Sequence, residues 1–238
     1  MFGSLLFTAL LFLTVLPYAM LVVLLRIFSE SASYRAVVWW ADLVCWLGDQ
    51  LCGLRYEVDG LDNLPDKPCV VLIKHSSAYE TITQLRIFPW QTWVLKRELM
   101  WAPFFGWGLK AVNPIAIDRS AGNSAVQQVL EQGTAALAAG RYVMVFPEGT
   151  RMPPGETRRY GMSGTLLAQE AGCPVVPVAH NAGDYWPRRG WRKRPGTVRF
   201  CIGEPMDPTG RDPREFNLEI QARIEAKVAE LRAAAGHA

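Results

Sequence analysis

The sequence predicts an α/β fold, with helices covering a largely parallel central sheet, preceded by an N-terminal membrane-associated helical segment. Three observations lead to this prediction. Residues 2–25 form an apolar run without a charged side chain. From residue 56 onward, short β-rich runs alternate with runs of helical periodicity, which favours parallel strands joined by helices. Polar clusters follow several of these strands. We expect membrane-associated helices in residues 1–55 and an α/β domain in residues 56–238.

The first element is the apolar run from Phe2 to Leu25, which Arg26 closes. At about 1.5 Å per residue, a helix of this length can cross a hydrocarbon layer of about 30 Å, so we interpret it as a membrane element. A cleaved signal peptide is the alternative, but no basic leader precedes the run and no clear cleavage pattern follows it. Because Pro17 interrupts the run, a kinked or half-embedded helix fits as well as a straight span.

The second element, residues 36–54, carries three tryptophans among aliphatic residues. Tryptophans gather at the headgroup boundary of a membrane, but a helix buried against the protein gives the same pattern, and both interpretations stay open. Arg26 and Arg35 favour the cytoplasmic side for the chain that follows. We therefore expect a membrane protein whose site faces the cytoplasm, at the inner or plasma membrane if the protein is bacterial.

The remaining elements are short runs rich in β-branched and aromatic residues, separated by helical candidates. Strands are expected at residues 56–58, 69–74, 92–96, 114–117, 142–146, 175–178 and 197–202. Helices are expected between them at residues 78–88, 103–111, 122–139 and 161–171. From Phe216 to Leu231, apolar residues recur at steps of three or four, which predicts a C-terminal amphipathic helix.

Composition argues against several classes of protein. Basic residues number 25 and acidic residues 22, so no strong overall field favours nucleic acid as a partner. The five cysteines form no C-x-x-C pair and most lie in apolar runs, so we expect a reducing compartment and neither a disulfide framework nor a zinc site. No group of side chains has the spacing of metal ligands, and no metal is expected.

The strongest chemical signal is a histidine followed five positions later by a carboxylate, His75 and Glu80. A histidine whose second ring nitrogen is held by a carboxylate can act as a general base near neutral pH. Ser77 and Glu80 also form an S-x-x-E capping box, so Glu80 has an alternative role at a helix start. Lys74 is expected on the surface, because adjacent side chains along a strand point to opposite faces.

A second polar cluster is the run Phe-Pro-Glu-Gly-Thr-Arg at residues 146–151. By its spacing alone it is a glycine turn bearing an arginine, whose guanidinium can bind phosphate through two parallel hydrogen bonds. Asp118 and Arg119 follow another predicted strand. Because the carboxyl ends of parallel strands meet at one edge of a sheet, we expect these clusters and His75 to form one site.

Together these clusters resemble the 1-acylglycerol-3-phosphate acyltransferases, the PlsC-like branch of the glycerolipid acyltransferases. Signatures of that family are a His-four residues-Asp block and a Phe-Pro-Glu-Gly-Thr-Arg block. The likeness runs from about Val70 to Val178 in the family's order, and its further segments are residues 94–106, 115–119 and 175–178. One departure is Glu80, where the family usually has aspartate. Glutamate there also resembles the lipid A late acyltransferases, which lack an intact block like residues 146–151.

The resemblance implies roles for individual residues. His75 would take the proton from an acceptor hydroxyl, Glu80 would orient the histidine, and the alkoxide would attack an acyl thioester without an acyl-enzyme intermediate. The implied substrate-binding residues are Lys96, Arg119, Glu148, Gly149, Thr150 and Arg151, of which the three basic ones would contact phosphate. No cofactor is implied, since acyl-CoA or acyl-ACP acts as a co-substrate.

The implied reaction moves a fatty acyl group to the sn-2 hydroxyl of lysophosphatidic acid and gives phosphatidic acid. It would belong to an acyltransferase domain at residues 56–238, with membrane phospholipids and an acyl donor, acyl-CoA or acyl carrier protein, as partners and no nucleic acid. Another acceptor, such as a lyso-ornithine lipid, is one alternative. A non-catalytic membrane phospholipid-binding protein is another, whereas a serine hydrolase lacks its G-x-S-x-G elbow here.

One further motif is a basic run in a proline-flanked loop, Arg-Arg-Gly-Trp-Arg-Lys-Arg at residues 188–194. It is either a solvated charge run or a surface for phosphate-bearing partners. Among the latter, anionic headgroups, the phosphates of coenzyme A and an acidic carrier protein stay open as alternatives.

Overall fold

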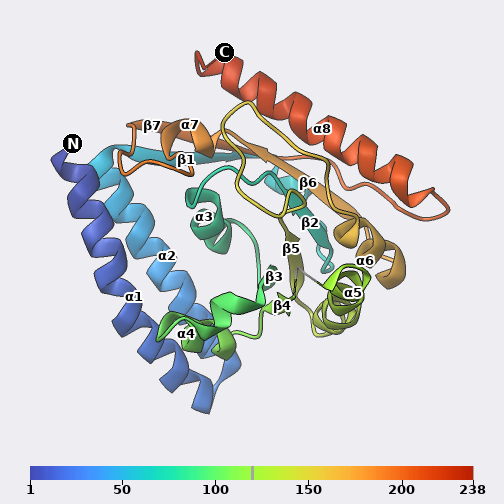
Figure 1. Cartoon of the computed structure of the whole chain (residues 1–238), viewed down its shortest axis with the longest axis horizontal. Coiled ribbons are helices and arrows are strands. Elements are labelled where there is room, and N and C mark those ends of the chain that lie inside the picture. The colour runs from blue at the N-terminus through green and yellow to red at the C-terminus, as the bar shows by residue number, and fades with distance from the viewer. Residues whose placement is uncertain (119–120, 238) are drawn as a thin grey trace.

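The structure is a computed structural model that describes residues 1–118 and 121–237. It begins with two long helices, α1 (Phe2–Phe28) and α2 (Glu30–Cys52), which lie side by side as a hairpin (Figure 1). Ser29 joins them in an extended conformation, and its hydroxyl accepts a hydrogen bond from Ala32 N at 3.3 Å, which caps α2. Gly53 ends α2 at φ +63°, a conformation that glycine adopts without strain.

A seven-stranded sheet forms the centre of the molecule, with the order β1-β7-β6-β2-β5-β3-β4. The strands are β1 (Leu54–Asp59), β2 (Val70–Ile73), β3 (Gln91–Lys96), β4 (Ile115–Ile117), β5 (Tyr142–Val145), β6 (Val175–His180) and β7 (Gly196–Ile202). All neighbouring strands pair in parallel except β6 and β7, which are antiparallel. The predicted fold class, a largely parallel sheet covered by helices, is therefore confirmed.

Helices cover both faces of this sheet. After the hairpin they are α3 (Tyr79–Ile87), α4 (Phe105–Ala111), α5 (Asn123–Ala138), α6 (Ser163–Ala171), α7 (Ala182–Tyr185) and α8 (Pro213–Ala234), with short 3₁₀ turns at η1 (Leu61–Asn63) and η2 (Arg97–Trp101). One buried cluster joins the sheet to α1, α2 and α3, and a second joins it to α5, α6 and α8. Strands β2, β5 and β6 are buried along their whole length, as central parallel strands with helices on both faces are.

Two helices differ from the sequence expectation. Helix α2 begins at Glu30, six residues before the predicted start at residue 36, because the Ser29 cap rather than the tryptophan-rich run sets its beginning. Helix α7 was not predicted, since a single turn of four residues carries no periodicity.

Helix α1 exposes most of its apolar surface. It is long and apolar enough to cross a membrane, and only 11% of its most hydrophobic window is buried. Large side chains along it are exposed, among them Phe2, Phe12 and Leu13 at 70% or more. One such helix near the N-terminus is weak evidence for membrane association, because a signal sequence has the same length and composition.

Candidate active site

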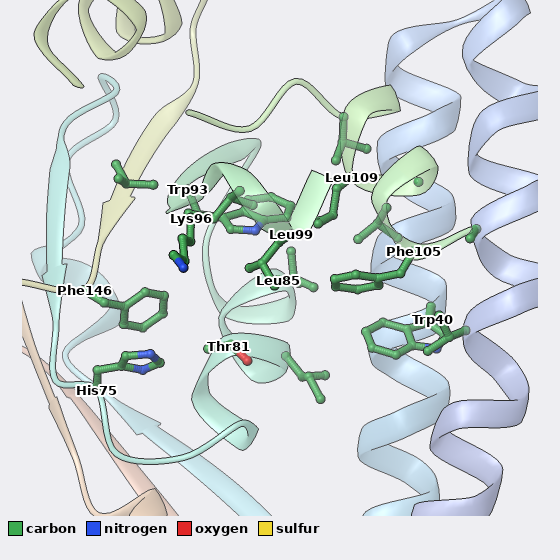
Figure 2. Close-up of a pocket in the computed structure, with 18 of the residues that line it drawn as sticks. Trp40, His75, Thr81, Leu85, Trp93, Lys96, Leu99, Phe105, Leu109 and Phe146 are labelled. Atoms are coloured by element: carbon green, nitrogen blue, oxygen red, sulfur yellow. The ribbon is translucent and has the colours of Figure 1, made fainter. Parts of the chain in front are cut away.

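His75 lies in the loop between β2 and α3, at the carboxyl end of a central strand. Its Nδ1 is 2.9 Å from Oε1 of Glu80, which stands in the first turn of α3 and is fully buried. The imidazole stacks on the ring of Phe146, with centroids 4.2 Å apart and planes 29° from parallel. Figure 2 shows the two rings together at one end of a cavity. The imidazole of His75 is therefore oriented by a hydrogen bond to Glu80 at its edge and by stacking on Phe146 at its face.

Glu80 makes the predicted orienting contact and the alternative capping contact at once. Its Oε1 accepts hydrogen bonds from the backbone N–H groups of Ser76 at 2.9 Å and Ser77 at 2.8 Å. The Ser77 hydroxyl in turn accepts from Tyr79 N at 3.0 Å, which completes the helix start. Burial alone would raise the pKa of Glu80, but the hydrogen bonds that it accepts from His75 and Ser77 outweigh it, so this pKa lies below its usual value.

An ionised Glu80 selects one tautomer of His75. The carboxylate has no proton to give, so Nδ1 carries the hydrogen and donates it to Oε1. The lone pair of the ring is then on Nε2, to which no described residue forms a hydrogen bond. Because His75 also lines the cavity, Nε2 is available to accept a proton from a bound hydroxyl group.

Lys74, the residue before His75, is buried rather than on the surface, so the sequence prediction for it was wrong. Its side chain is 2% exposed, and its ammonium group donates to Glu148 Oε1 at 2.8 Å, to Glu225 Oε1 at 2.8 Å and to the Glu156 carbonyl at 2.8 Å. The side chain does point away from His75, as strand alternation requires. However, α8 and the chain before α6 cover that face of the sheet, which local sequence does not reveal.

Glu148 connects this buried cluster to the histidine. While Oε1 binds Lys74, Oε2 accepts a hydrogen bond from the backbone N–H of His75 at 2.8 Å. The His75 carbonyl accepts from Met152 N at 2.7 Å, so Glu148 and the residue that follows the run at 146–151 bind the two backbone polar groups of His75. Burial raises the pKa of Glu148. Glu148 is not among the described residues that line the cavity, and its predicted contact with substrate stays a prediction.

A second buried histidine, His180, binds the backbone just before His75. It is fully buried; Nε2–H donates to the Lys74 carbonyl at 2.7 Å, and Nδ1 accepts from Ala182 N at 3.1 Å. Both ring nitrogens are therefore occupied by backbone groups. Burial lowers the pKa of His180, so the ring stays neutral.

The cavity beside His75 has a volume of about 420 Å³ and two chemically different ends. The polar end is formed by His75, Lys96, Gly149, Thr150, Arg151 and Arg188. The rest is lined by apolar side chains of α1, α2, α3, β3 and α4. Figure 2 shows Trp40, Phe105 and Leu109 next to the helical hairpin, opposite His75 and Phe146. A molecule with a charged head and a long apolar tail matches this arrangement.

The structure brings most of the predicted substrate-binding residues to the polar end. Gly149, at φ +67°, makes the turn there, and Thr150 and Arg151 follow it. Lys96 also lines the cavity, although its ammonium group is 3.1 Å from Glu98 Oε1. Arg119 lies outside the described residues. Their contacts with substrate stay predictions.

Two features of the site were missed by sequence reasoning. Arg188 reaches the polar end from a loop that is remote in sequence, and the helical hairpin contributes to the apolar wall. The basic run at 188–194 was a signal for the first, but nothing local to it indicates which part of the molecule it meets. The apolar residues of the hairpin carry no signal that separates a cavity wall from a lipid contact.

Comparison with known proteins places these features in a family. The family model described as Acyltransferase matches residues 55–181. A 1-acyl-sn-glycerol-3-phosphate acyltransferase of Pseudomonas aeruginosa is 48% identical over 203 residues, which cover 85% of this chain and 79% of that protein. The human 1-acyl-sn-glycerol-3-phosphate acyltransferase alpha is 29% identical over 166 residues, 68% of this chain and 59% of the human one.

A solved structure shows the same fold. The crystal structure of the 1-acyl-sn-glycerophosphate (LPA) acyltransferase, PlsC, from Thermotoga maritima matches with a TM-score of 0.80 at 22% identity. The match covers 98% of this chain and 95% of that one, so it includes the N-terminal hairpin as well as the sheet.

Proposed function

The chain belongs to the acyltransferase family, and from this premise we propose that it transfers a fatty acyl group from an acyl thioester to the sn-2 hydroxyl of lysophosphatidic acid, giving phosphatidic acid. The observation that carries the proposal is the position of His75. Its Nδ1 is bound by a buried carboxylate, while its ring lies with basic side chains at the polar end of a cavity that is otherwise apolar. Lysophosphatidic acid carries its hydroxyl close to a phosphate and has a long acyl chain, which matches this arrangement.

The reaction follows from the tautomer of His75. Nε2 takes the proton of the acceptor hydroxyl as the oxygen attacks the thioester carbonyl, and Glu80 stabilises the imidazolium that forms. The tetrahedral intermediate collapses, the new ester forms, and the carbon–sulfur bond breaks. The thiolate leaves and receives the proton from Nε2, which returns the histidine to its starting state. Positioning of the two substrates supplies the rest of the rate gain.

The acceptor's two ends suggest how it lies in the cavity. A phosphate group matches the guanidinium of Arg151 and the ammonium of Lys96, and Arg119 would join them. Acyl chains match the apolar walls formed by the hairpin, α3 and α4. Gly149 and Thr150 line the polar end next to Arg151, and we propose that they contact the glycerol backbone.

Membrane attachment by residues 1–55 is part of the proposal. The exposed apolar face of α1 continues into exposed aromatic side chains near α4, namely Trp101, Phe104 and Trp107. Aromatic residues at this density favour a membrane interface. With Arg26 and Arg35 on the cytoplasmic side, the cavity would open toward the cytoplasm, where acyl-CoA or acyl carrier protein supplies the acyl group. Bound phospholipids would then surround the hairpin.

An activity matrix on the purified full chain in detergent tests the proposal. The donors are acyl-CoA and acyl-ACP; the acceptors are lysophosphatidic acid, a lyso-ornithine lipid and a monoacylglycerol. Formation of phosphatidic acid from lysophosphatidic acid with at least one donor is expected. Acylation of the phosphate-free acceptors without use of lysophosphatidic acid would overturn the acceptor assignment, and binding of lysophosphatidic acid without turnover would overturn the enzymatic one.

A further inference from the structure

Two arginines meet at the polar end of the cavity. Arg188 Nη1 donates a hydrogen bond to the Arg151 carbonyl at 3.0 Å, and both residues line the cavity. Neither forms an ion pair with a carboxylate of any described residue. Some arginines elsewhere in the fold do, as in the pairs of Arg232 with Asp184 and Arg97 with Asp118.

This arrangement points to an anion from outside the chain. Two cationic side chains that line one cavity attract an anion, and a bound anion satisfies the guanidinium N–H donors that remain. A phosphate ester suits the task, because its oxygens match the guanidinium fork of each arginine. Lys96, in contrast, already has a carboxylate partner in Glu98. The arginine pair is therefore the better phosphate site of the two.

The loop that carries Arg188 is bound to other elements both before and after Arg188 in the sequence. Before it, the Trp186 carbonyl accepts a hydrogen bond of 2.6 Å from the hydroxyl of Ser77, at the start of α3. After it, Lys193 is buried against α1, and its ammonium group donates to Thr8 Oγ1 at 2.5 Å and lies 4.7 Å from the centroid of Trp186. The Ser4 hydroxyl also accepts a hydrogen bond from Lys193 N at 3.0 Å.

These anchors hold Arg188 in place before a ligand arrives. One is next to the catalytic histidine and the other is on the first membrane-associated helix. The remaining basic side chains of the loop, Arg189, Arg192 and Arg194, are exposed and are not among the described residues that line the cavity.

We propose that Arg188 is a phosphate-binding residue of the active site and that it forms a clamp with Arg151 around a phosphate ester of the substrate. The proposal rests on the function proposed above and adds a residue outside residues 55–181, the segment that the family model matches. Two substrates can present the phosphate: the acceptor, lysophosphatidic acid, or the donor, acyl-CoA. The chemistry of the clamp is the same for both, and kinetics separate them.

The experiment compares Arg188→Gln with Arg189→Gln in the full chain in detergent. Loss of charge-assisted hydrogen bonds to phosphate raises the KM by about tenfold or more, with kcat within about twofold of the parent. A rise in KM for lysophosphatidic acid with both acyl-CoA and acyl-ACP identifies the acceptor phosphate. A rise only in KM for acyl-CoA identifies the donor. Arg189→Gln, one residue away but outside the cavity, is expected to match the parent.

A lysine variant separates the charge of Arg188 from its hydrogen-bonding geometry, and the parent protein tests the function proposed above. Arg188→Lys keeps the charge and loses the fork, so its KM is expected between those of the parent and Arg188→Gln. Because Arg188 is exposed, the thermal midpoints of all three variants are expected to stay near that of the parent. Unchanged KM values for both substrates in Arg188→Gln would overturn the clamp. If the parent itself ignores lysophosphatidic acid, the function proposed above fails instead.

Discussion

Lys74 and His75 are adjacent in the chain, but their side chains enter two different environments. His75 faces the cavity with one ring nitrogen bound to Glu80 and the other without a hydrogen bond to a described residue. Lys74 enters a closed cluster behind the sheet, where Glu148, Glu225 and the Glu156 carbonyl surround its ammonium group at 2.8 Å. We refer to these as the front face and the back face of the loop.

The two faces differ in how many hydrogen-bond donors and acceptors remain without a partner among the described residues. On the back face each N–H of Lys74 meets an oxygen, and Tyr160 and Thr157 also donate to Glu225, so little capacity remains for a substrate. On the front face, one acceptor of His75 has no hydrogen bond to a described residue. Glu148 joins the faces by holding the His75 backbone. Charges on the back face therefore hold the His75 backbone, whereas on the front face Glu80 binds one ring nitrogen of His75 and the other ring nitrogen stays open to the cavity.

Replacing His75 on the front face has the largest expected effect. His75→Ala removes the proposed base and should lower kcat by about 10²–10⁴-fold, the range attributed to general acid–base catalysis. Stability should fall as well, because the ring stacks on Phe146 and donates to the buried Glu80, so kcat is measured on folded protein. His237→Ala, near the C-terminus and outside the cavity lining, is the control and should keep full activity. Activity of His75→Ala within a fewfold of the parent would remove His75 from the mechanism.

Replacing Lys74 tests the back face by stability. Lys74→Met keeps much of the volume but leaves the buried carboxylate of Glu148 without its cation. Breaking a buried ion pair in this way costs about 3–5 kcal/mol. The free energy of unfolding in detergent measures it, with Lys227→Met as the control, since the pair of Lys227 with Glu230 lies on the surface of α8 and is worth about 1 kcal/mol or less. Equal losses in the two variants would contradict the distinction between the faces.

Glu80 has two roles: it holds the loop backbone at Ser76 and Ser77, and it carries a negative charge beside His75. The variant Glu80→Gln separates these roles. The amide oxygen can still accept from His75, Ser76 and Ser77, so the geometry is retained. The negative charge beside the imidazolium is lost, and kcat should fall by about 10²-fold at constant KM. Glu230→Gln on the surface should leave kcat unchanged. Full activity of Glu80→Gln would restrict Glu80 to its capping role.

The sheet could be predicted because its signals are local. Strand β2 is a continuous apolar run between a proline loop and a polar cluster, and β5 is a continuous apolar run as well. The grouping of His75 with residues 146–151 also followed from the sequence, because the carboxyl ends of parallel strands share one edge. Roles within that group stay predictions until activity is measured.

What could not be predicted depends on contacts between distant segments. Glu225, which neutralises Lys74, is 151 positions away on α8, so strand alternation alone placed Lys74 wrongly. Arg188 reaches Arg151 only because a loop is anchored to α1. Neither contact has a local pattern, and no rule of spacing leads to it.

His180 provides the smallest and most specific test of how the loop is supported. Its pKa is lowered by burial, so between about pH 6.5 and the lower folded value the unfolded chain binds a proton that the folded chain does not. The stability is complete above about pH 6.5 and declines as the pH falls, by at most about 1.4 kcal/mol per pH unit. Glu80, whose pKa is also lowered, acts in the same direction below about pH 4.3.

The comparison between variants isolates His180 from the other groups. Glu148, with its raised pKa, acts in the opposite direction but is common to all variants. The thermal midpoint of the parent should fall more between pH 7.5 and pH 5.5 than that of His180→Gln, which does not titrate there. His237→Gln should follow the parent. Parallel pH dependence of the parent and His180→Gln would mean that this histidine is protonated as easily in the folded chain as in the unfolded one, contrary to its burial beneath Lys74.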